Sequence, residues 1–580
     1  MRQQPFARWW RSDHVVLGVL ALAAGALAGG GAILFGLAFH AVQASVLAPG
    51  MLVEVVASLA WYQLLLVPTL GGLLIGILCS RVLPGDQPNG VAQVIETVRF
   101  RGSGIPLAHG ASAALVNSLA IGVGGSVGRE GPIVHLGAAM ASAVAERFRL
   151  DPRMARTLLA SGVAAAIAAA FNAPIAGVLF ALEVVIGHYA LAALSPVVIA
   201  SVIGTIVVRL YERDMAVPFL PPQEIASFLE FPAFALLGLV CGIVAVGLLK
   251  GIGLVHAAHE HWRVRRWLRP AIAGLVTGII ALGFPHVMGV GYETTVGALR
   301  DGMDLELVLA LALAKCVATA VCLGSRFGGG IFSPALMLGA LVGIGFGMLA
   351  SSLTPGPSSS DALYGMLGMG AVAGAVLGAP LSTSAMIFEL TQDYEMTLAL
   401  MVTVAIATVF TMQIHGQSFF TWQLTTQGIE VDKPMEERLL ARRHVRELLH
   451  RDYHLVGVDA PLVDLVHCFE RSALPIYVED DAGSFVGEVR FADLAAAAFE
   501  PTSDGLSAAA DLARPAPLVL HAADDLDTAW RRVAMQSDDH VPVVVSADEP
   551  KLAGHVRQRD LVLAYNQAVL EARARERGER

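Results

Sequence analysis

The stretch Gly-Arg-Glu-Gly-Pro at residues 128–132 and the stretch Gly-Ile-Phe-Ser-Pro at residues 330–334 decide the fold of this chain. Both have the pattern Gly-x-x-x-Pro, and both lie within long apolar regions. Proline is favoured in the first turn of a helix, because the N–H that it lacks would have no intrahelical partner there. We therefore expect two helices to begin at these stretches, in corresponding places of two halves of the chain.

The composition places most of the chain in a membrane, surrounded by lipid. Of its 580 residues, 55% are hydrophobic and 15% are charged, and the mean hydropathy is +0.63. A soluble core does not need this much apolar sequence. Apolar runs before residue 425 are long enough to span a bilayer, and glycine and proline interrupt several of them. The net charge of −10 argues against a nucleic-acid partner, and the five cysteines show no paired spacing, so we expect no metal site or disulfide.

A second pair of motifs indicates an internal repeat. Phe-Asn-Ala-Pro at 171–174 is followed by Glu183, and Gly-Ala-Pro at 378–380 is followed by Glu389, each glutamate nine residues after its proline. Basic residues precede the first long apolar run of the first half and follow that of the second. They are Arg2, Arg8 and Arg11 in the first half and Arg263, Arg265, Arg266 and Arg269 in the second. Because basic loops stay inside, the halves enter the membrane in opposite directions, which predicts an inverted repeat with broken helices and a cytoplasmic N-terminus.

Helix starts at membrane depth are suited to binding anions. The first N–H groups of a helix have no intrahelical partner, and the helix dipole adds a partial positive charge there. Glycines let the backbone approach an ion closely. A third stretch, Gly-Ser-Gly-Ile-Pro at 102–106, has the same character, and Ser103 adds a hydroxyl donor. For any single stretch the alternative is that its glycines only allow close helix packing.

Glu130 is the strongest single candidate for a functional residue. An acidic side chain at membrane depth costs about 2.5 to 3.5 kcal/mol on insertion scales and usually has a function. At a helix N-terminus its carboxylate would compete with a permeant anion for the same amides, and it would release them when protonated. The alternative is a capping carboxylate paired with Arg129.

Together these segments resemble the CLC family of chloride channels and chloride/proton antiporters. The stretches that carry the resemblance are GSGIP (102–106), GREGP (128–132), FNAPIAGVLFALE (171–183), GGIFSP (329–334) and GAPLSTSAMIFELTQDYE (378–395). The resemblance implies a homodimer with one anion pathway in each subunit. It also implies that Ser103 and the amides of Ile331 and Phe332 line a central chloride site, that Glu130 is the gate, and that amides around Gly131 form an outer site.

Two departures from the family pattern bear on mechanism. Phe420 stands where the family usually has a tyrosine whose hydroxyl donates to the central chloride, so chloride binding there should be weaker. Proton-coupled members carry two adjacent acids at the end of the FNAP helix, whereas here Glu183 is followed by Val184. Glu183 either lines the inner vestibule or bonds to backbone, and His188 is either a substitute proton acceptor or an interfacial residue.

We therefore favour a passive chloride channel, gated by voltage or pH, over the alternative of a chloride/proton antiporter. A membrane-embedded enzyme is a remote alternative, because no HExxH or GxSxG motif occurs in the membrane part. No cofactor is required for this function. The compact loops and alanine-rich helices indicate a bacterial host and a multi-pass protein of the plasma (inner) membrane, with both termini cytoplasmic.

After residue 425 the sequence has a soluble α/β character. Leu474–Val478 and Val541–Val545 are strand candidates, and each is followed by Gly-x-Val-Arg-x-x-Asp-Leu after the same interval of 67 residues. This repeat resembles a tandem pair of CBS domains, which often bind adenine nucleotides. The alternative is a purely structural or dimerising role. The nucleotide candidates are Arg490, Asp493, Arg557 and Asp560.

The expected fold class is thus an all-α polytopic membrane domain with inverted repeats and broken helices, followed by a soluble α/β CBS pair. The expected divisions are a tail (1–13), a membrane domain (14–424, with halves at about 14–211 and 230–424), a linker (425–442), CBS domains at 443–500 and 508–566, and a charged tail (567–580).

Overall fold

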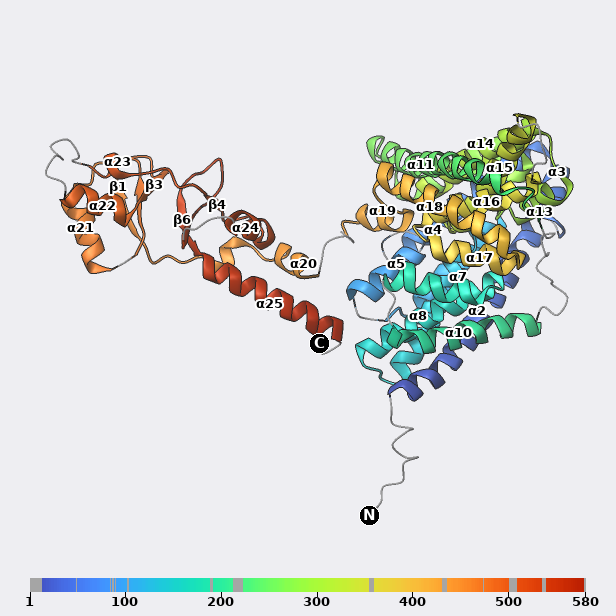
Figure 1. The fold of residues 1–580 in the computed structure, drawn as a ribbon, viewed down its shortest axis with the longest axis horizontal. Helices are drawn as coiled ribbons and strands as arrows, with labels where there is room; N and C mark the ends of the chain where they lie inside the picture. Colours follow the sequence, from blue (N-terminus) through green and yellow to red (C-terminus); the bar gives the residue numbers. More distant parts are fainter. Residues whose placement is uncertain are drawn as a thin grey trace, which may run out of the picture. The chain divides into compact units, whose positions relative to one another are not determined.

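A computed structural model describes residues 13–47, 49–83, 85, 88, 90–101, 104–187, 191–211, 223–353, 359–429, 435–472, 474–499, 508–534 and 539–577. The chain divides into two compact units, Met1–Ile429 and Glu430–Arg580. The first is helical and the second contains two small sheets, as Figure 1 shows. The predicted fold class is confirmed in both parts.

The first unit is built from apolar helices. In its first half they are α2 (Asp13–Val46), α3 (Leu52–Ser58), α4 (Trp61–Val82), α5 (Val91–Glu96), α6 (Leu107–Gly122), α7 (Glu130–Arg147), α8 (Pro152–Phe171), α9 (Pro174–Phe180) and α10 (Leu191–Tyr211). In the second half they are α11 (Phe231–His261), α12 (Arg269–Gly283), α13 (Tyr292–Asp301), α14 (Leu305–Gly324), α15 (Phe332–Leu353), α16 (Asp361–Leu377), α17 (Pro380–Thr391), α18 (Tyr394–His415) and α19 (Phe419–Thr425). Short π-helical segments η2 (Thr97–Arg101) and η3 (Ala181–Ile186) continue α5 and α9.

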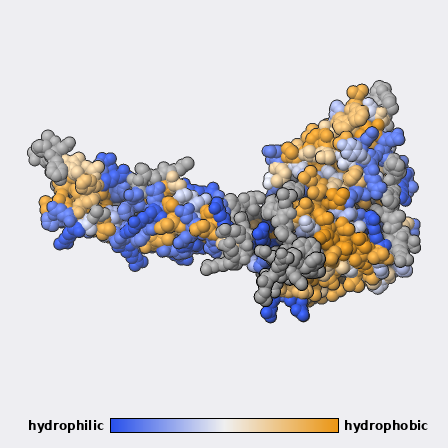
Figure 2. Space-filling view, turned by 60° about the horizontal axis from the view of Figure 1, so that its bottom comes forward, coloured by the Kyte–Doolittle hydropathy of each residue, from blue (hydrophilic) through white to orange (hydrophobic). Residues whose placement is uncertain are grey.

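Within the described residues, eight of these helical segments are long and apolar enough to cross a membrane. Several helices between them, such as Leu107–Gly122 and Asp361–Leu377, are apolar but shorter. Figure 2 shows hydrophobic surface over much of the first unit and mainly hydrophilic surface over the second. A mixture of full-length and shortened apolar helices is what the broken-helix prediction requires.

The helix breaks follow directly from the sequence. Helix α8 ends at Asn172, whose φ of 56° is left-handed, and Pro174 then starts α9. In the second half α16 ends at Gly378, with φ 66°, and Pro380 starts α17. Asparagine and glycine accept this conformation more readily than other residues, and proline is favoured at a helix start. The same stop and restart therefore occurs in both halves.

The two halves contact each other reciprocally through these helix starts. The Glu389 carboxylate on α17 accepts hydrogen bonds from the amides of residues 175–176 at the start of α9 (2.9 and 2.8 Å). In return, the Glu183 carboxylate in η3 accepts from the amides of residues 381–382 at the start of α17 (3.2 and 2.9 Å). Such mutual contacts are those of a two-fold relation between repeats. A carboxylate also compensates the positive end of each helix dipole.

The second unit repeats one small α/β motif. Its helices are α20 (Met435–Ala441), α21 (Leu462–Arg471), α22 (Phe491–Phe499), α23 (Ala509–Leu512), α24 (Leu526–Val533) and α25 (Gln558–Arg577). Strands β1 (His454–Gly457), β2 (Ile476–Glu479) and β3 (Phe485–Val489) form one sheet, and β4 (Leu520–His521), β5 (His540–Val544) and β6 (Leu552–Arg557) form the other. In each sheet the first strand is parallel to the second and the third is antiparallel to it. Both predicted strand segments are present.

Candidate functional site

The two Gly-x-x-x-Pro stretches contact each other within the first unit. The Gly128 N–H donates to the Gly330 carbonyl (2.6 Å), and the Gly330 N–H donates to the Gly128 carbonyl (2.7 Å). This antiparallel bridge places the starts of α7 and α15 side by side. The approach requires glycine, since a Cβ atom on Gly330 would lie 3.0 Å from the Gly131 nitrogen. Two helix N-termini from different halves therefore converge.

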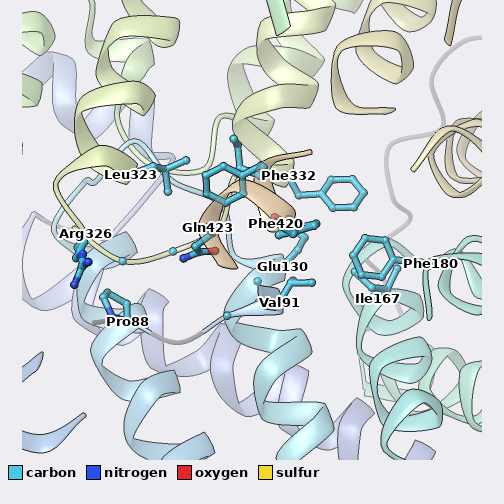
Figure 3. A pocket seen from close by; sticks show the side chains of 17 residues that line it. Pro88, Val91, Glu130, Ile167, Phe180, Leu323, Arg326, Phe332, Phe420 and Gln423 are labelled. Atoms are coloured by element: carbon cyan, nitrogen blue, oxygen red, sulfur yellow. The ribbon is translucent and has the colours of Figure 1, made fainter. Parts of the chain in front are cut away.

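A narrow cavity of about 60 Å³ lies at this junction. One water-sized sphere occupies roughly 10 to 15 Å³, so the cavity has room for a small dehydrated ion or a few waters. Six separate parts of the chain contribute its described lining, and Figure 3 shows their side chains. The lining residues are Pro88, Gly90, Val91, Glu130, Gly131, Ile167, Phe180, Leu323, Arg326, Gly328, Gly329, Gly330, Ile331, Phe332, Phe419, Phe420 and Gln423.

Glu130 is buried at this cavity, with 1% of its surface exposed. Its carboxylate accepts a hydrogen bond from the Tyr292 hydroxyl (2.8 Å), one from the Ser333 hydroxyl, and a longer one from the Ser333 N–H (3.3 Å). The last donor belongs to the first turn of α15. The carboxylate from one half thus occupies the anion-binding end of a helix from the other half. Competition between this carboxylate and a permeant anion for the same donors stays a prediction.

Arg129 takes a different role from the ion pair considered above. Its Nη2 donates to the Ala170 carbonyl (3.1 Å), and its guanidinium carbon lies 5.2 Å from the centre of the Tyr292 ring. The described contacts of Glu130 come from Tyr292 and Ser333 instead. The guanidinium is therefore positioned against the ring whose hydroxyl binds the carboxylate.

Aromatic rings form the apolar part of the cavity wall. The Phe332 ring is 6.0 Å from the Phe180 ring, and Phe180 meets Phe420 edge to face at 6.4 Å between ring centres. Phe420 is buried and lines the cavity, where it offers no hydroxyl group. Gly131, Ile331, Phe332 and Phe420, which the resemblance implicates in chloride binding, therefore lie around one cavity with Glu130.

Among the described residues, a further part of the wall is formed by Pro88, Gly90 and Val91. Gly90 and Val91 line the cavity at the start of α5, and the Gly90 N–H is capped by Gln93 Oε1 (2.8 Å). Ser103 lies outside the described residues, but the Ile105 N–H donates to Ser142 Oγ (2.8 Å). Ser142 is twelve residues beyond Glu130 on α7, or about 18 Å along the helix axis. The structure thus brings residues 104–106 to the other end of α7.

Comparison with known proteins agrees with this geometry. Residues 71–412 match the family model described as voltage gated chloride channel, and residues 445–500 match the CBS domain. The chain belongs to the voltage-gated chloride channel family. The CLC resemblance read from the motifs and the CBS resemblance are confirmed.

Individual relatives include proteins named as channels and as exchangers. A ClcB-like chloride channel protein of Ralstonia nicotianae is 35% identical over 60% of this chain and 82% of its own length. An H(+)/Cl(-) exchange transporter ClcA of Vibrio parahaemolyticus is 32% identical over 55% of this chain and 70% of its own. A voltage-gated ClC-type chloride channel ClcB of Escherichia coli is 30% identical over 64% of this chain and 89% of its own length.

Solved structures share the fold at lower identity. A slow cyanobacterial Cl−/H+ antiporter has a TM-score of 0.63 at 23% identity and covers 71% of this chain and 97% of its own. A eukaryotic CLC transporter has a TM-score of 0.60 at 19% identity and covers 93% of this chain and 98% of its own.

The residue after Glu183, where the resemblance leads one to expect a second acid in a proton-coupled member, is Val184. Val184 is buried in η3, and its carbonyl accepts a hydrogen bond from Arg99 Nη2 (2.7 Å), while the Val185 carbonyl accepts from Arg99 Nε (3.0 Å). Glu183 bonds to backbone amides of α17 rather than lining the cavity. His188 lies outside the described residues.

The nucleotide candidates of the second unit are engaged in ion pairs. Arg514 contacts Asp493 (2.5 Å), His450 contacts Asp560 (2.7 Å), Glu488 contacts Arg490 (2.9 Å), and Asp452 contacts Arg557. Buried polar atoms nearby, including the Tyr477 hydroxyl and both ring nitrogens of His555, have no hydrogen-bond partner among the described residues. Burial, with a smaller contribution from His540, lowers the pKa of His555 from 6.5 to about 4.

Proposed function

We propose that this protein transports chloride through the cavity at the α7–α15 junction, with Glu130 as the gate. The observation that carries the proposal is that the Glu130 carboxylate binds the first turn of α15 from the opposite half. A carboxylate and a chloride ion would use the same donors, so each excludes the other. The family membership and the chloride channels among the relatives support the choice of anion.

The donors around the cavity suit rapid passage. Helix N-termini and glycine amides supply partial charges, which bind an anion without holding it as tightly as a directly paired cation would. Arg326 lines the same cavity and adds positive charge that attracts anions to it. When Glu130 is protonated, its carboxyl no longer competes as an anion, and chloride replaces it at the amides.

We further propose that transport is passive. In support, Val184 has no titratable group, and its carbonyl is bonded to the Arg99 guanidinium. A positive charge beside this position disfavours the arrival of a proton. Exchange of chloride for protons, as named for the ClcA relative, is the alternative, and a proton flux in fixed ratio to chloride would favour it.

The test of the gate is the Glu130→Gln variant, which keeps the shape of the side chain and removes its charge. We expect chloride efflux from proteoliposomes that hardly changes between acidic and neutral pH, while the unmodified protein accelerates on acidification. Glu306→Gln is the matched control, because Glu306 also lies in the first turn of a membrane-unit helix but is exposed. Unchanged pH dependence in Glu130→Gln would remove Glu130 from the gate.

The assembly and location are part of the proposal. We infer a homodimer in the bacterial plasma (inner) membrane, with one pathway in each subunit and both termini cytoplasmic. Family membership and the distribution of basic residues support it. Light scattering of the purified protein and protease accessibility of the C-terminal unit in inside-out vesicles test these points.

Adenine-nucleotide binding by the second unit is a separate proposal that its CBS domain supports. A nucleotide that uses Asp493 and Asp560 would have to displace Arg514 and His450. Calorimetry of the full-length protein with ATP and AMP tests it, and no heat at millimolar ligand would overturn it.

A further inference from the structure

Two hydroxyl groups converge on the gate carboxylate. Tyr292 Oη is 2.8 Å from Glu130 Oε1, and the Ser333 hydroxyl donates to the same oxygen. The two hydroxyls also lie 3.3 Å from each other. The Ser333 N–H reaches the second oxygen, Oε2, at 3.3 Å. Tyr292, Ser333 and Glu130 thus form a closed set of contacts between α13, α15 and α7.

The Tyr292 ring is held from several sides. Its ring meets Phe171 edge to face at 6.4 Å, and the Arg129 guanidinium lies over it. Gly291, immediately before it, has a left-handed φ of 94°, which glycine adopts without strain. The turn is therefore shaped so that the hydroxyl points at the carboxylate.

A buried lysine fixes the turn that leads to Tyr292. Lys315 on α14 is fully buried, and its Nζ donates to the carbonyls of Val287 and Gly289 (3.0 Å each). The Gly289 N–H in turn donates to the Gly124 carbonyl, at 3.3 Å. Ring, turn and lysine together leave the Tyr292 hydroxyl little freedom to move away from Glu130.

The donors respond differently to the two states of the carboxylate. An ionised carboxylate only accepts hydrogen bonds, so it can satisfy all three donors at once. A protonated carboxyl must donate one bond itself, and hydroxyl groups can turn to accept it, but the Ser333 N–H cannot. Hydrogen bonds to the charged form stabilise that form relative to the neutral one. The set of contacts therefore favours the ionised, pathway-blocking state.

We propose that Tyr292 and Ser333 are positioning residues that hold the Glu130 carboxylate in the blocking position and so set the pH at which the pathway opens. This proposal rests on the proposed gate role of Glu130. Among the described residues, the charged and titratable groups near the carboxylate are Tyr292 on α13, Arg129 immediately before α7, and Arg326 in the cavity wall. Neither arginine is altered in the test.

The test compares Tyr292→Phe, Ser333→Ala and the double variant in the full-length protein reconstituted in liposomes. Chloride efflux is measured from pH 4 to pH 8, after each variant is shown by size exclusion to be a homogeneous species. Removing a hydrogen bond to a charged group changes the ratio of the ionised to the protonated carboxyl by roughly tenfold or more. We therefore expect the pH of half-maximal efflux to rise by about one unit in each single variant. Because the two hydroxyls contact each other, the shift in the double variant should differ from the sum of the single shifts.

The matched control is Tyr364→Phe. Tyr364 is a buried tyrosine of α16 whose hydroxyl donates to a carboxylate, that of Glu230, at 2.9 Å, but it does not line the cavity. Its pH profile should match that of the unmodified protein. A profile that is unchanged in Tyr292→Phe and Ser333→Ala, while Glu130→Gln abolishes pH dependence, would overturn the positioning role and leave the gate intact. Persistent pH dependence in Glu130→Gln would overturn the gate itself.

Discussion

Replacing Gly330 by alanine should separate the two helix starts that form the cavity. A Cβ atom at this position would lie 3.0 Å from the Gly131 nitrogen, 3.4 Å from its Cα atom and 3.6 Å from the Gly128 carbonyl oxygen. All three neighbours are backbone atoms, so they cannot move away by a side-chain rotation. The backbone of one stretch would therefore have to shift by a few tenths of an ångström, which would distort the antiparallel bridge between the two stretches.

Gly330→Ala should reduce both the stability of the protein and its affinity for chloride. Overpacking of a tight contact costs about 1 to 3 kcal/mol of stability. The added methyl group would also cover the Gly131 N–H, which is one of the donors proposed for chloride. A hydrogen bond to a charged group contributes about 1.5 to 3 kcal/mol, so chloride affinity should fall roughly 10- to 100-fold.

The assay is calorimetric titration of chloride into the purified protein, together with its thermal unfolding. Gly247→Ala is the control, because a Cβ atom at Gly247 on α11 meets no atom within 4 Å. The control should bind chloride normally and be as stable as the unmodified protein or slightly more stable. Unchanged chloride affinity and stability in Gly330→Ala would refute the view that this backbone contact builds the site.

Three further predictions concern other parts of the chain. Phe420→Tyr should add a hydroxyl donor to the cavity and increase the chloride affinity measured by calorimetry by roughly 3- to 10-fold, a gain of about 1 kcal/mol. Unchanged affinity would contradict the role given to Phe420. Glu389→Gln should lower the free energy of unfolding by about 1 to 3 kcal/mol, because two amides of α9 lose a charged acceptor, whereas Glu395→Gln at an exposed site should not. Burial lowers the pKa of His555 from 6.5 to about 4, so folding favours the neutral form of its ring. The free energy of unfolding of the second unit should therefore fall as the pH drops below 6.5, by about 2 kcal/mol at pH 5. Amide exchange of β5 and β6 in the full-length protein measures this loss, and equal protection at pH 7 and pH 5 would disprove it.

The sequence predicted the helix starts of this site well, because local chemistry determines them. In both halves a glycine followed by a proline four residues later marks the beginning of a helix, α7 in the first half and α15 in the second. The breaks at Asn172 and Gly378 are likewise local features. The acid of α7 could be singled out because a carboxylate at membrane depth is rare.

Contacts between distant segments could not be read in the same way. The lining residues Pro88, Gly90 and Val91 belong to none of the motifs singled out in the sequence. In this segment Gln93 caps the Gly90 N–H, and a glutamine three residues after a glycine is found at many ordinary helix starts. Tyr292 carried no signal at all, because a single tyrosine in an apolar region belongs to no motif, and its hydroxyl meets Glu130 only through the tertiary fold.

Glu183 and Glu389 also show that contacts between distant segments cannot be predicted from local sequence. Their repeated spacing predicted that they are equivalent, and their reciprocal bonds to α17 and α9 agree with that equivalence. The sequence left open whether Glu183 lines the vestibule or bonds to backbone. The answer depends on the other half of the chain, about 200 residues away.

The most direct test of the central claim is the simultaneous measurement of chloride and proton fluxes. The full-length protein is reconstituted in liposomes with a chloride gradient, the membrane potential is set by valinomycin, and external chloride and external pH are recorded together. Our account predicts chloride release above that of empty liposomes, without proton uptake in fixed ratio. Proton uptake in constant proportion to chloride release would contradict passive conduction and identify an exchanger, and no chloride release above that of empty liposomes would contradict the proposed pathway.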